Sequence, residues 1–505
     1  MDSSNGERIA KNTLVLYLRM LIVTVVGLFT SRIILSALGI EDFGLFSVVG
    51  GVVSLFTFFR SSMEKCTQRF LNVEMTKPEG RVNEIFNNAL IIHAFIAVMA
   101  VIVAESLGLW FLNNYIQIPE GRSFAANCVY QTVVGGLLLT IMSIPYCATI
   151  IANERMGMFA AISIIECLFY LGIAFVISHT NTDRLILYAV LLLLSKCFSF
   201  LFYIVYCHKK IVDTTLNLVY NKQICKEMMA YVSWTLVGHA MILGTNQGNS
   251  ILVNMFHGVT SNAAMAVANQ VNGHVLQLTG NFQTAFNPQI TKSYASRNYD
   301  YLYKLVVSTS KISFFLLFVV SLPLLLNIDL ILDVWLVDVP VQTNVFCVLM
   351  ISSGILQATT APLNFSVMAT GRIKWFQIVT GCVFLSDLVI LYGLFNLGLP
   401  APTAMWVKLF IMIMVTIVRI CFAHHLIPTI RVVSYLRDVL VPILFISAIC
   451  VTVALLLMRI ADTVFIQIMV SFAIAIFAIV VIYFMGLSKR ERQMLVEFVL
   501  RKKRK

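Results

Sequence analysis

The chain contains about fourteen apolar segments that are each long enough to cross a lipid bilayer, for which a helix needs roughly 20 apolar residues. They span residues 12–38, 43–60, 88–112, 123–151, 158–178, 184–206, 231–256, 262–287, 305–328, 342–368, 375–396, 401–424, 438–459 and 463–486. Of 505 residues, 59% are hydrophobic and 12% are charged, which excludes an ordinary soluble domain. The first segment starts late and contains Arg19 and Arg32, so we expect no cleavable signal peptide.

The net charge of +12 is distributed over alternate loops. One set of loops holds most of the cations, among them Arg60, Lys65, Arg69, Lys77, Lys222, Lys292, Arg372 and Arg431. The opposite set holds acids such as Glu41, Asp183 and Asp333. By the positive-inside rule, the basic loops and both termini are predicted to be cytoplasmic. The charge therefore indicates membrane topology and contact with the bilayer, and predicts no nucleic-acid partner.

The sequence predicts no enzyme. No connecting loop exceeds roughly thirty residues, which leaves no room for a catalytic domain of ordinary size. The 11 cysteines form no CxxC or Cys/His cluster, and most lie inside apolar segments as small packing residues. We therefore expect no cofactor, no metal and no disulfide framework.

The predicted fold is all-α: a polytopic membrane protein of about 14 transmembrane helices, arranged as two pseudo-symmetric six-helix lobes plus two C-terminal helices. The segments are 1–210 (N-terminal lobe), 211–228 (cytoplasmic linker), 229–430 (C-terminal lobe), 431–487 (two extra helices) and 488–505 (basic cytoplasmic tail). A faint internal repeat supports parallel lobes, because Ser31 aligns with Ser250 and Gly39 with Gly258.

Two apolar segments between Trp234 and Ile290 are crowded with amide side chains. Gln270, His274, Gln277, Asn281 and Thr284 step by four and three residues, which places them on one helix face. Such a stripe is typical of a water-filled or solute-lined path inside a bundle. The alternative is that these side chains only join helix to helix, but so many polar residues favour the solute path.

Four cations lie inside apolar segments, at Arg19, Arg32, Lys196 and Lys408. Near an aqueous path they favour an anion, and arginine can bind a phosphate through two donors. Snorkelling, or pairing with Glu105, Glu166 or Asp387, is the alternative. Coupling to an ion through Glu166 or Asp387 is a further possibility. The predicted cavity set is Arg19, Arg32, Lys196, His239, Asn246, Asn249, Gln270, His274, Gln277, Asn281, Thr284 and Lys408.

Several motifs carry a family resemblance. They are Lys11-Asn12-Thr13-Leu14, Thr30-Ser31-Arg32, the turn from Leu38 to Gly44, Thr67-Gln68-Arg69-Phe70-Leu71, Asn246-Gln247-Gly248 and the run from Phe282 to Tyr294. In these residues the chain resembles the O-antigen and capsule flippases, the Wzx-type polysaccharide transporters of the multidrug/oligosaccharidyl-lipid/polysaccharide exporter superfamily.

The resemblance implies two lobes facing one cavity that opens alternately to either side of the bacterial cytoplasmic (inner) membrane. It implies a polyprenyl-pyrophosphate-linked oligosaccharide as cargo, from O-antigen, capsule or exopolysaccharide synthesis, with a polysaccharide polymerase and glycosyltransferases as candidate partners. One alternative is a multidrug or organic-cation exporter of the same superfamily, which would need an acid in the cavity wall. A membrane-bound glycosyltransferase or polymerase, or a membrane scaffold, fits the short loops and the polar stripe less well.

Overall fold

The computed structural model is built of helices, and the parts of the chain that it describes contain no strand. The structure describes residues 3–54, 57–115, 118, 121–211, 214–217, 219–336, 338–460, 463–488 and 491–492. The predicted basic tail therefore lies outside the described residues, apart from residues 488 and 491–492.

The helices follow one another with short connections. In the first half they are α1 (Ser3–Ser54), α2 (Thr57–Glu74), α3 (Val82–Val103), α4 (Leu109–Tyr115), α5 (Ser123–Ala152), α6 (Met156–Ser178) and α7 (Arg184–Lys210). In the second half they are α8 (Lys222–Ala295), α9 (Tyr299–Leu326), α10 (Ile328–Trp335), α11 (Thr343–Thr370), α12 (Lys374–Asn396), α13 (Thr403–Leu426), α14 (Val432–Tyr435), α15 (Val441–Met458) and α16 (Val464–Val481). The short π-helical turns η1 (Ala104–Gly108), η3 (Leu436–Leu440) and η4 (Ile482–Gly486) continue α3, α14 and α16.

Two glycines divide the longest helices. Gly39 interrupts α1 and Gly258 interrupts α8, each with a positive φ of 79°. A residue with a Cβ atom avoids this region, so glycine lets the chain turn back on itself at these points. Each long helix is therefore a pair of helices joined by a one-residue kink.

The chain is an all-α multi-pass membrane protein. Among the described residues, twelve helices are long and apolar enough to cross a membrane. At 1.5 Å per residue the 74 residues of α8 extend about 110 Å, which is enough for two passes on either side of Gly258. The predicted span 43–60 falls on the second half of α1 and the start of α2, and residues 55 and 56 within it lie outside the described residues.

The predicted boundary of the second apolar segment, at residue 60, is wrong. The charge pattern predicts a cytoplasmic loop at Arg60, Lys65 and Arg69, but these residues lie within α2, which continues to Glu74. This helix is held by packing within the bundle, because Cys66 and Leu71 are completely buried. Hydropathy alone places a segment end at the first charged residue, although the helix continues.

Residue contacts divide the chain into two compact units. Lys11–Ser233 forms the N-terminal unit, and Met1–Ala10 together with Trp234–Lys505 forms the C-terminal unit. Both boundaries fall inside helices, in α1 and in α8. The first turns of α8 therefore pack with the N-terminal unit.

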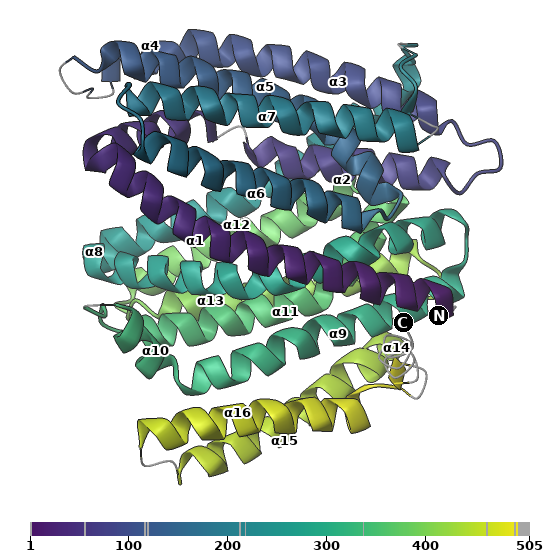
Figure 1. The fold of residues 1–505 in the computed structure, drawn as a ribbon. Coiled ribbons are helices and arrows are strands. Elements are labelled where there is room, and N and C mark those ends of the chain that lie inside the picture. The colour runs from purple at the N-terminus through teal and green to yellow at the C-terminus, as the bar shows by residue number, and fades with distance from the viewer. Residues whose placement is uncertain are drawn as a thin grey trace, which may run out of the picture. The chain divides into compact units, whose positions relative to one another are not determined.

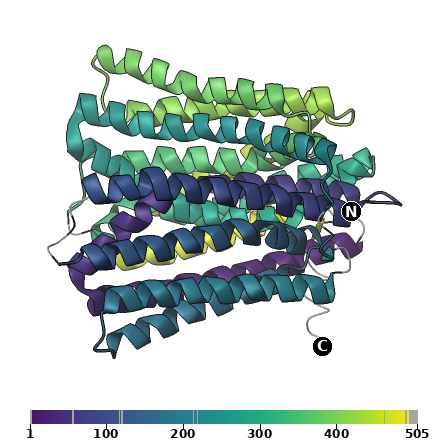
Figure 2. The same ribbon diagram turned by 90° about the horizontal axis from the view of Figure 1, so that it is seen from above.

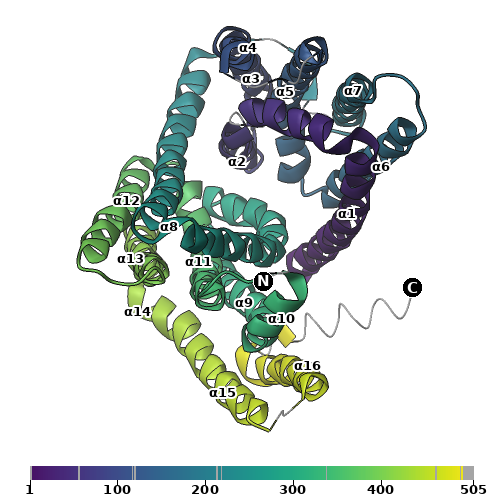
Figure 3. The same ribbon diagram turned by 90° about the vertical axis from the view of Figure 1, so that its left-hand side faces the viewer.

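The N-terminal unit is a bundle centred on α5. This helix packs against α2, α3 and α7, and α6 packs against α7 (Figures 1 and 3). Val129 and Tyr130 of α5 are completely buried in its core, beside Ala189 of α7. Because α5 contacts so many neighbours, polar side chains on it and on α2 and α7 can meet inside the bundle.

The segment between α7 and α8 is bound to α3. The Asn87 side chain donates a hydrogen bond to the Thr215 carbonyl (2.9 Å) and accepts one from the Asn217 amide (2.9 Å). Asn88 accepts a hydrogen bond from the Asn221 amide at 2.8 Å. Side chains thus satisfy backbone groups that have no helical partner there, and they fix this part of the predicted linker to the N-terminal unit.

The C-terminal unit is a second bundle, in which α11 packs against α9 and α13, and α12 packs against α13. Phe346, Leu391 and Val415 are completely buried in its core. The helices α9 and α11 to α13 run roughly along a common direction in Figure 1, and the ribbons in the view from above keep that direction (Figure 2).

Helices α15 and α16 form an antiparallel pair that contacts α9 (Figure 1). Asn327, just after α9, donates a hydrogen bond to the Ser471 hydroxyl of α16 at 2.6 Å. Beyond η4, the Glu491 carboxylate pairs with Lys311 of α9 at 3.2 Å. Polar contacts, in addition to apolar packing, therefore attach the two extra helices to the bundle.

Candidate solute and ion sites

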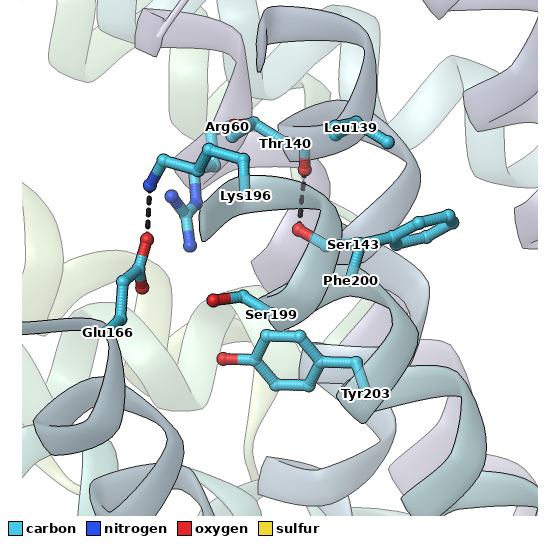
Figure 4. A pocket seen from close by; sticks show the side chains of 9 residues that line it. All are labelled: Arg60, Leu139, Thr140, Ser143, Glu166, Lys196, Ser199, Phe200 and Tyr203. Atoms are coloured by element: carbon cyan, nitrogen blue, oxygen red, sulfur yellow. Dashed lines mark hydrogen bonds and ion pairs between the residues drawn. The ribbon is translucent and has the colours of Figure 1, made fainter. Parts of the chain in front are cut away.

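A polar pocket lies inside the N-terminal unit (Figure 4). It lies between α2, α5, α6 and α7 and spans about 330 Å³, part of which is open to solvent. Its lining consists of Arg60, Leu139, Thr140, Ser143, Glu166, Lys196, Ser199, Phe200 and Tyr203. Two of these side chains are cations and one is an anion, so the pocket carries an excess of positive charge.

An ion pair joins two walls of this pocket. Lys196 of α7 pairs with the Glu166 carboxylate of α6, and Glu166 also accepts a hydrogen bond from the Tyr170 hydroxyl at 2.9 Å. The side chains of Lys196 and Glu166 are 33% and 23% exposed, so the pair is largely shielded from solvent. For Lys196 the structure therefore shows the pairing alternative that the sequence left open, and Glu166 is not an isolated acid.

The remaining polar groups of the pocket are mainly donors. The Arg60 guanidinium and the hydroxyls of Ser199 and Tyr203 form no hydrogen bond to any other described residue. Figure 4 shows them directed into the space beside the Glu166–Lys196 pair. Unused N–H and O–H donors beside a cation suit an anionic or hydroxyl-rich group of a solute.

The two predicted arginines of α1 have different surroundings. The Arg19 guanidinium lies over the Phe159 ring of α6, 4.7 Å from its centroid, and its buried Nε has no hydrogen-bond partner among the described residues. It interacts electrostatically with Glu166 and Tyr203 of the pocket. Arg32 is exposed and forms no ion pair with a described residue. Only Arg19 is therefore associated with the pocket.

The C-terminal unit contains a buried carboxylate at Asp387 of α12. Asp387 is 1% exposed, and its Oδ2 accepts a hydrogen bond from the Asn249 amide at 2.7 Å. Asp387 Oδ1 and Asn249 Oδ1 are also buried, and neither has a partner among the described residues. Two unused oxygen acceptors, one of them charged, can hold a proton or a small hard cation.

Lys408 of α13 lies near this acid without a direct hydrogen bond to it. Its Nζ donates to Asn246 Oδ1 at 3.4 Å and is 3.5 Å from Met350 Sδ. Lys408 is about 7.5 Å from the start of its helix, whereas Lys196 is about 18 Å from the start of α7. The two lysines, on corresponding helices, therefore lie at different depths and have different partners.

The predicted stripe on α8 faces away from the interior of the C-terminal unit. Gln270, His274 and Gln277 are exposed and hydrogen-bond to no described residue. Val275, between them, is only 5% exposed. These three polar side chains therefore do not join α8 to another helix of its unit, and their contact with a solute stays a prediction.

The other predicted polar residues are less uniform. Asn281 and Thr284 are half-buried, and the Thr284 hydroxyl bonds to the Gly280 carbonyl at 2.9 Å. His239 is half-buried, and Asn246 is exposed. Asn249 is buried and binds Asp387, so this amide does join one helix to another.

Sequence reasoning missed Arg60, Ser199 and Tyr203 as site residues. Arg60 was assigned to a loop, while Ser199 and Tyr203 are ordinary residues in an apolar segment. Lys196, Ser199 and Tyr203 follow one another at intervals of three and four residues, so all three lie on one face of α7. That spacing is the signal that could have located them.

Comparison with known proteins defines the fold. No protein-family model and no curated protein sequence matches the chain. Among solved structures, a crystal structure of a MATE mutant is similar with a TM-score of 0.71 and 12% identity, covering 84% of this chain and 97% of that chain. The outward-facing conformation of a multidrug resistance MATE family transporter of the MOP superfamily gives a TM-score of 0.67 at 11% identity, covering 84% and 96%.

A third similar structure is a MOP superfamily transporter from Pyrococcus furiosus, described as having a binding pocket of reverse polarity that suggests a different function. Its TM-score is 0.66 at 12% identity, with coverage of 85% of this chain and 99% of that chain. The chain therefore has the fold of MATE-type transporters, which confirms the predicted fold class. The narrower resemblance to O-antigen flippases stays a prediction.

Proposed function

We propose that the chain is an exporter that moves a solute across the membrane by alternating access. The observation that carries this proposal is the similarity to MATE transporters over 84% of the chain, at a TM-score of 0.71. The short loops and the polar pocket inside an apolar bundle agree with a transporter and with no enzymatic role.

Two classes of cargo are proposed. The similar multidrug resistance MATE transporter favours a multidrug or organic-cation exporter over the lipid-linked oligosaccharide flippase. The cation-rich pocket favours the second class, because Arg60 and Lys196 suit the pyrophosphate of a polyprenyl-linked oligosaccharide better than a cationic drug.

One experiment separates the two classes. The chain is produced in a host lacking its drug exporters and, separately, in a host lacking its O-antigen flippase. Restored drug resistance supports the first class, and restored surface glycan supports the second, with accumulated lipid-linked glycan identified by mass spectrometry. Arg60→Gln should abolish the restored activity, whereas Lys209→Gln, at an exposed lysine of α7, should retain it. Failure in both hosts at normal protein levels would contradict both.

We also propose that Asp387 binds the coupling ion in the C-terminal unit. The support is its burial and the two unused oxygens of Asp387 and Asn249. Purified protein should unfold at a higher temperature in sodium than in choline, or show a pH-dependent shift if the ion is a proton. Asp387→Asn should remove that dependence, whereas Asp329→Asn should keep it. Equal dependence in both variants would contradict the assignment.

We further propose that the chain lies in the bacterial cytoplasmic membrane with both termini in the cytoplasm. The support is the alternation of basic and acidic loops. Cysteines introduced next to Asp183 or Asp333 should react with an impermeant reagent added to intact cells. Cysteines next to Lys77 or Lys222 should not, and their labelling would reverse the orientation.

A further inference from the structure

Polar residues recur every four positions along α2. Arg60, Glu64, Gln68 and Asn72 form this series, which begins at the pocket and extends about 18 Å toward the end of the helix at Glu74. Residues four apart lie on one helix face. We call these four residues the α2 stripe.

The far part of the α2 stripe is buried inside the N-terminal unit. Asn72 is completely buried, and Gln68 is 5% exposed. Thr67, adjacent to the stripe, is 1% exposed. Helix α2 packs against α3 and α5, so these polar groups are enclosed by protein.

Asn72 is the informative residue of the stripe. Neither its Oδ1 nor its Nδ2 has a hydrogen-bond partner among the described residues, and the same is true of the Thr67 hydroxyl. A buried amide that loses both of its hydrogen bonds to water is strongly unfavourable. Such groups in proteins are usually satisfied by buried water.

The spacing of the stripe suits bridging water molecules. Side chains four residues apart on a helix have Cβ atoms about 5–6 Å apart, close to the span of one water that bonds to both. Asn72, Gln68 and Glu64 follow one another at this spacing, and Thr67 is three residues from Glu64. Water bound along them would therefore form a continuous series from the end of α2 to the pocket.

Glu64 provides a group that can accept a proton along this series. Charged and titratable groups on four helices interact electrostatically with it: Arg60 and Lys65 of α2, Arg19 of α1, Cys147 of α5 and Tyr203 of α7. Arg60 in turn interacts with Glu166 of α6. Arg60, Tyr203 and Glu166 also line the pocket, and Arg19 interacts electrostatically with two of them, Tyr203 and Glu166. A proton bound at Glu64 would change the charge balance of that pocket.

We propose that the α2 stripe is a hydrated proton path, along which a proton passes between the end of α2 and the Glu64 carboxylate. The proton moves from water to water past Asn72, Gln68 and Thr67 and protonates one Glu64 oxygen, and it leaves by the same series. The proposal rests on the proposed transport function, because it gives the pocket a proton to exchange.

Infrared difference spectroscopy of the purified protein tests the path without any cargo. Acidification should produce the C=O stretch of a protonated carboxylic acid, and Glu64→Gln should remove one such band. On transfer to D₂O the wild-type band should shift rapidly, because water reaches Glu64. Asn72→Leu conserves volume but removes the polar group, and it should slow that shift at least ~10-fold.

Cys66→Ala is the matched control. Cys66 is completely buried on the opposite face of α2, where its thiol donates to the Met228 carbonyl at 3.6 Å. This variant should exchange as fast as the wild type. If Asn72→Leu does not fold, Thr67→Val is measured in its place.

Three results would overturn the proposal: a carboxylic band that persists unchanged in Glu64→Gln, no titrating carboxyl at all, or equal exchange rates in the stripe variants and Cys66→Ala. None of these results depends on transport. A chain that exports neither cargo class could still show the Glu64 carboxylic band. Failure of the proposed export function can therefore be told apart from failure of the proposed proton path.

Discussion

Gly39 and Gly258, which are 219 residues apart, adopt the same backbone conformation, with φ at 79° in both and ψ at 170° and −178°. Each lies where a long helix turns back between two passes. The common conformation supports the internal repeat inferred from a few matched residues, because each of the two matched glycines interrupts a long helix with the same backbone angles. The two units therefore begin with the same helix–kink–helix element.

Alanine at either kink should destabilise the protein. An ideal Cβ atom would meet no heavy atom within 4 Å at Gly39 or Gly258, so crowding is not the cause. The positive φ with ψ near 180° is almost restricted to glycine, and we expect a cost of about 1–3 kcal/mol for Gly39→Ala or Gly258→Ala. Gly27→Ala, at a helical glycine with equal space, should be neutral or slightly stabilising. Thermal unfolding of the purified variants measures this, and equal midpoints for all three would contradict it.

Replacing one partner of the Glu166–Lys196 ion pair should destabilise the protein more than replacing both partners. Lys196→Met leaves the Glu166 carboxylate with the Tyr170 hydroxyl and the longer-range charges of Arg60 and Arg19. It should cost about 1–3 kcal/mol, less than for a fully buried pair because both side chains are partly exposed. The double variant Lys196→Met/Glu166→Gln should recover most of that loss. Chemical unfolding of the single and double variants tests the coupling. A double variant no more stable than Lys196→Met would show that the pair is not the cause.

The polar stripe of α8 should be dispensable for folding and required for export. Gln277 is exposed and bonds to no described residue, so Gln277→Leu strands no partner and should leave the unfolding temperature unchanged. If the side chain contacts cargo, export in the responding host should fall several-fold. Met255→Leu, at an exposed apolar position of α8, should change neither property. Poor folding with normal export would instead indicate that Gln277 joins helices.

The attachment of the C-terminal segment should weaken in acid. Burial raises the pKa of the Glu491 carboxyl, but Lys311 and hydrogen bonds from Ser308 and Ser488 outweigh it and lower that pKa below its ordinary value. A lowered pKa in the folded state means that the contact stabilises fully above the unfolded pKa, and that this stability is lost as the pH falls through the lowered value. Hydrogen exchange of the Ser488, Glu491 and Arg492 amides, which are hydrogen-bonded in this contact, should therefore accelerate in acid relative to its intrinsic rate. Glu491→Gln should show fast exchange already at neutral pH, and a pH-independent protection in the wild type would refute the role of Glu491.

The fold could be predicted from the sequence wherever the physical signal is local. Apolar length gave the helices, and the alignment of Gly39 with Gly258 gave the repeat. The failure at Arg60 has a physical cause: α2 is stabilised by packing against α3 and α5, which a hydropathy pattern along one helix does not contain. In the sequence, a charged residue inside a helix bundle gives the same hydropathy signal as one in a loop. The packing of the neighbouring helices is needed to distinguish them.

The site was harder to predict because its residues are spread over four helices. Lys196 and Glu166 were both recognised as unusual charges, but their pairing depends on how α6 and α7 face each other. Asp387 could be recognised only as an acid in an apolar segment, whereas its partner Asn249 is 138 residues away. Spacing within one helix can be read from the sequence, while contacts between helices need the packed bundle.

The asparagines of α3 have a consequence for the chain path between the two compact units. Asn87 and Asn88 bind Thr215, Asn217 and Asn221, just before α8, to the N-terminal unit. The chain then leaves that unit between Ser233 and Trp234, about three turns into α8. A hydrogen-bonded helix, and not a loop, therefore carries the chain out of the N-terminal unit at this point.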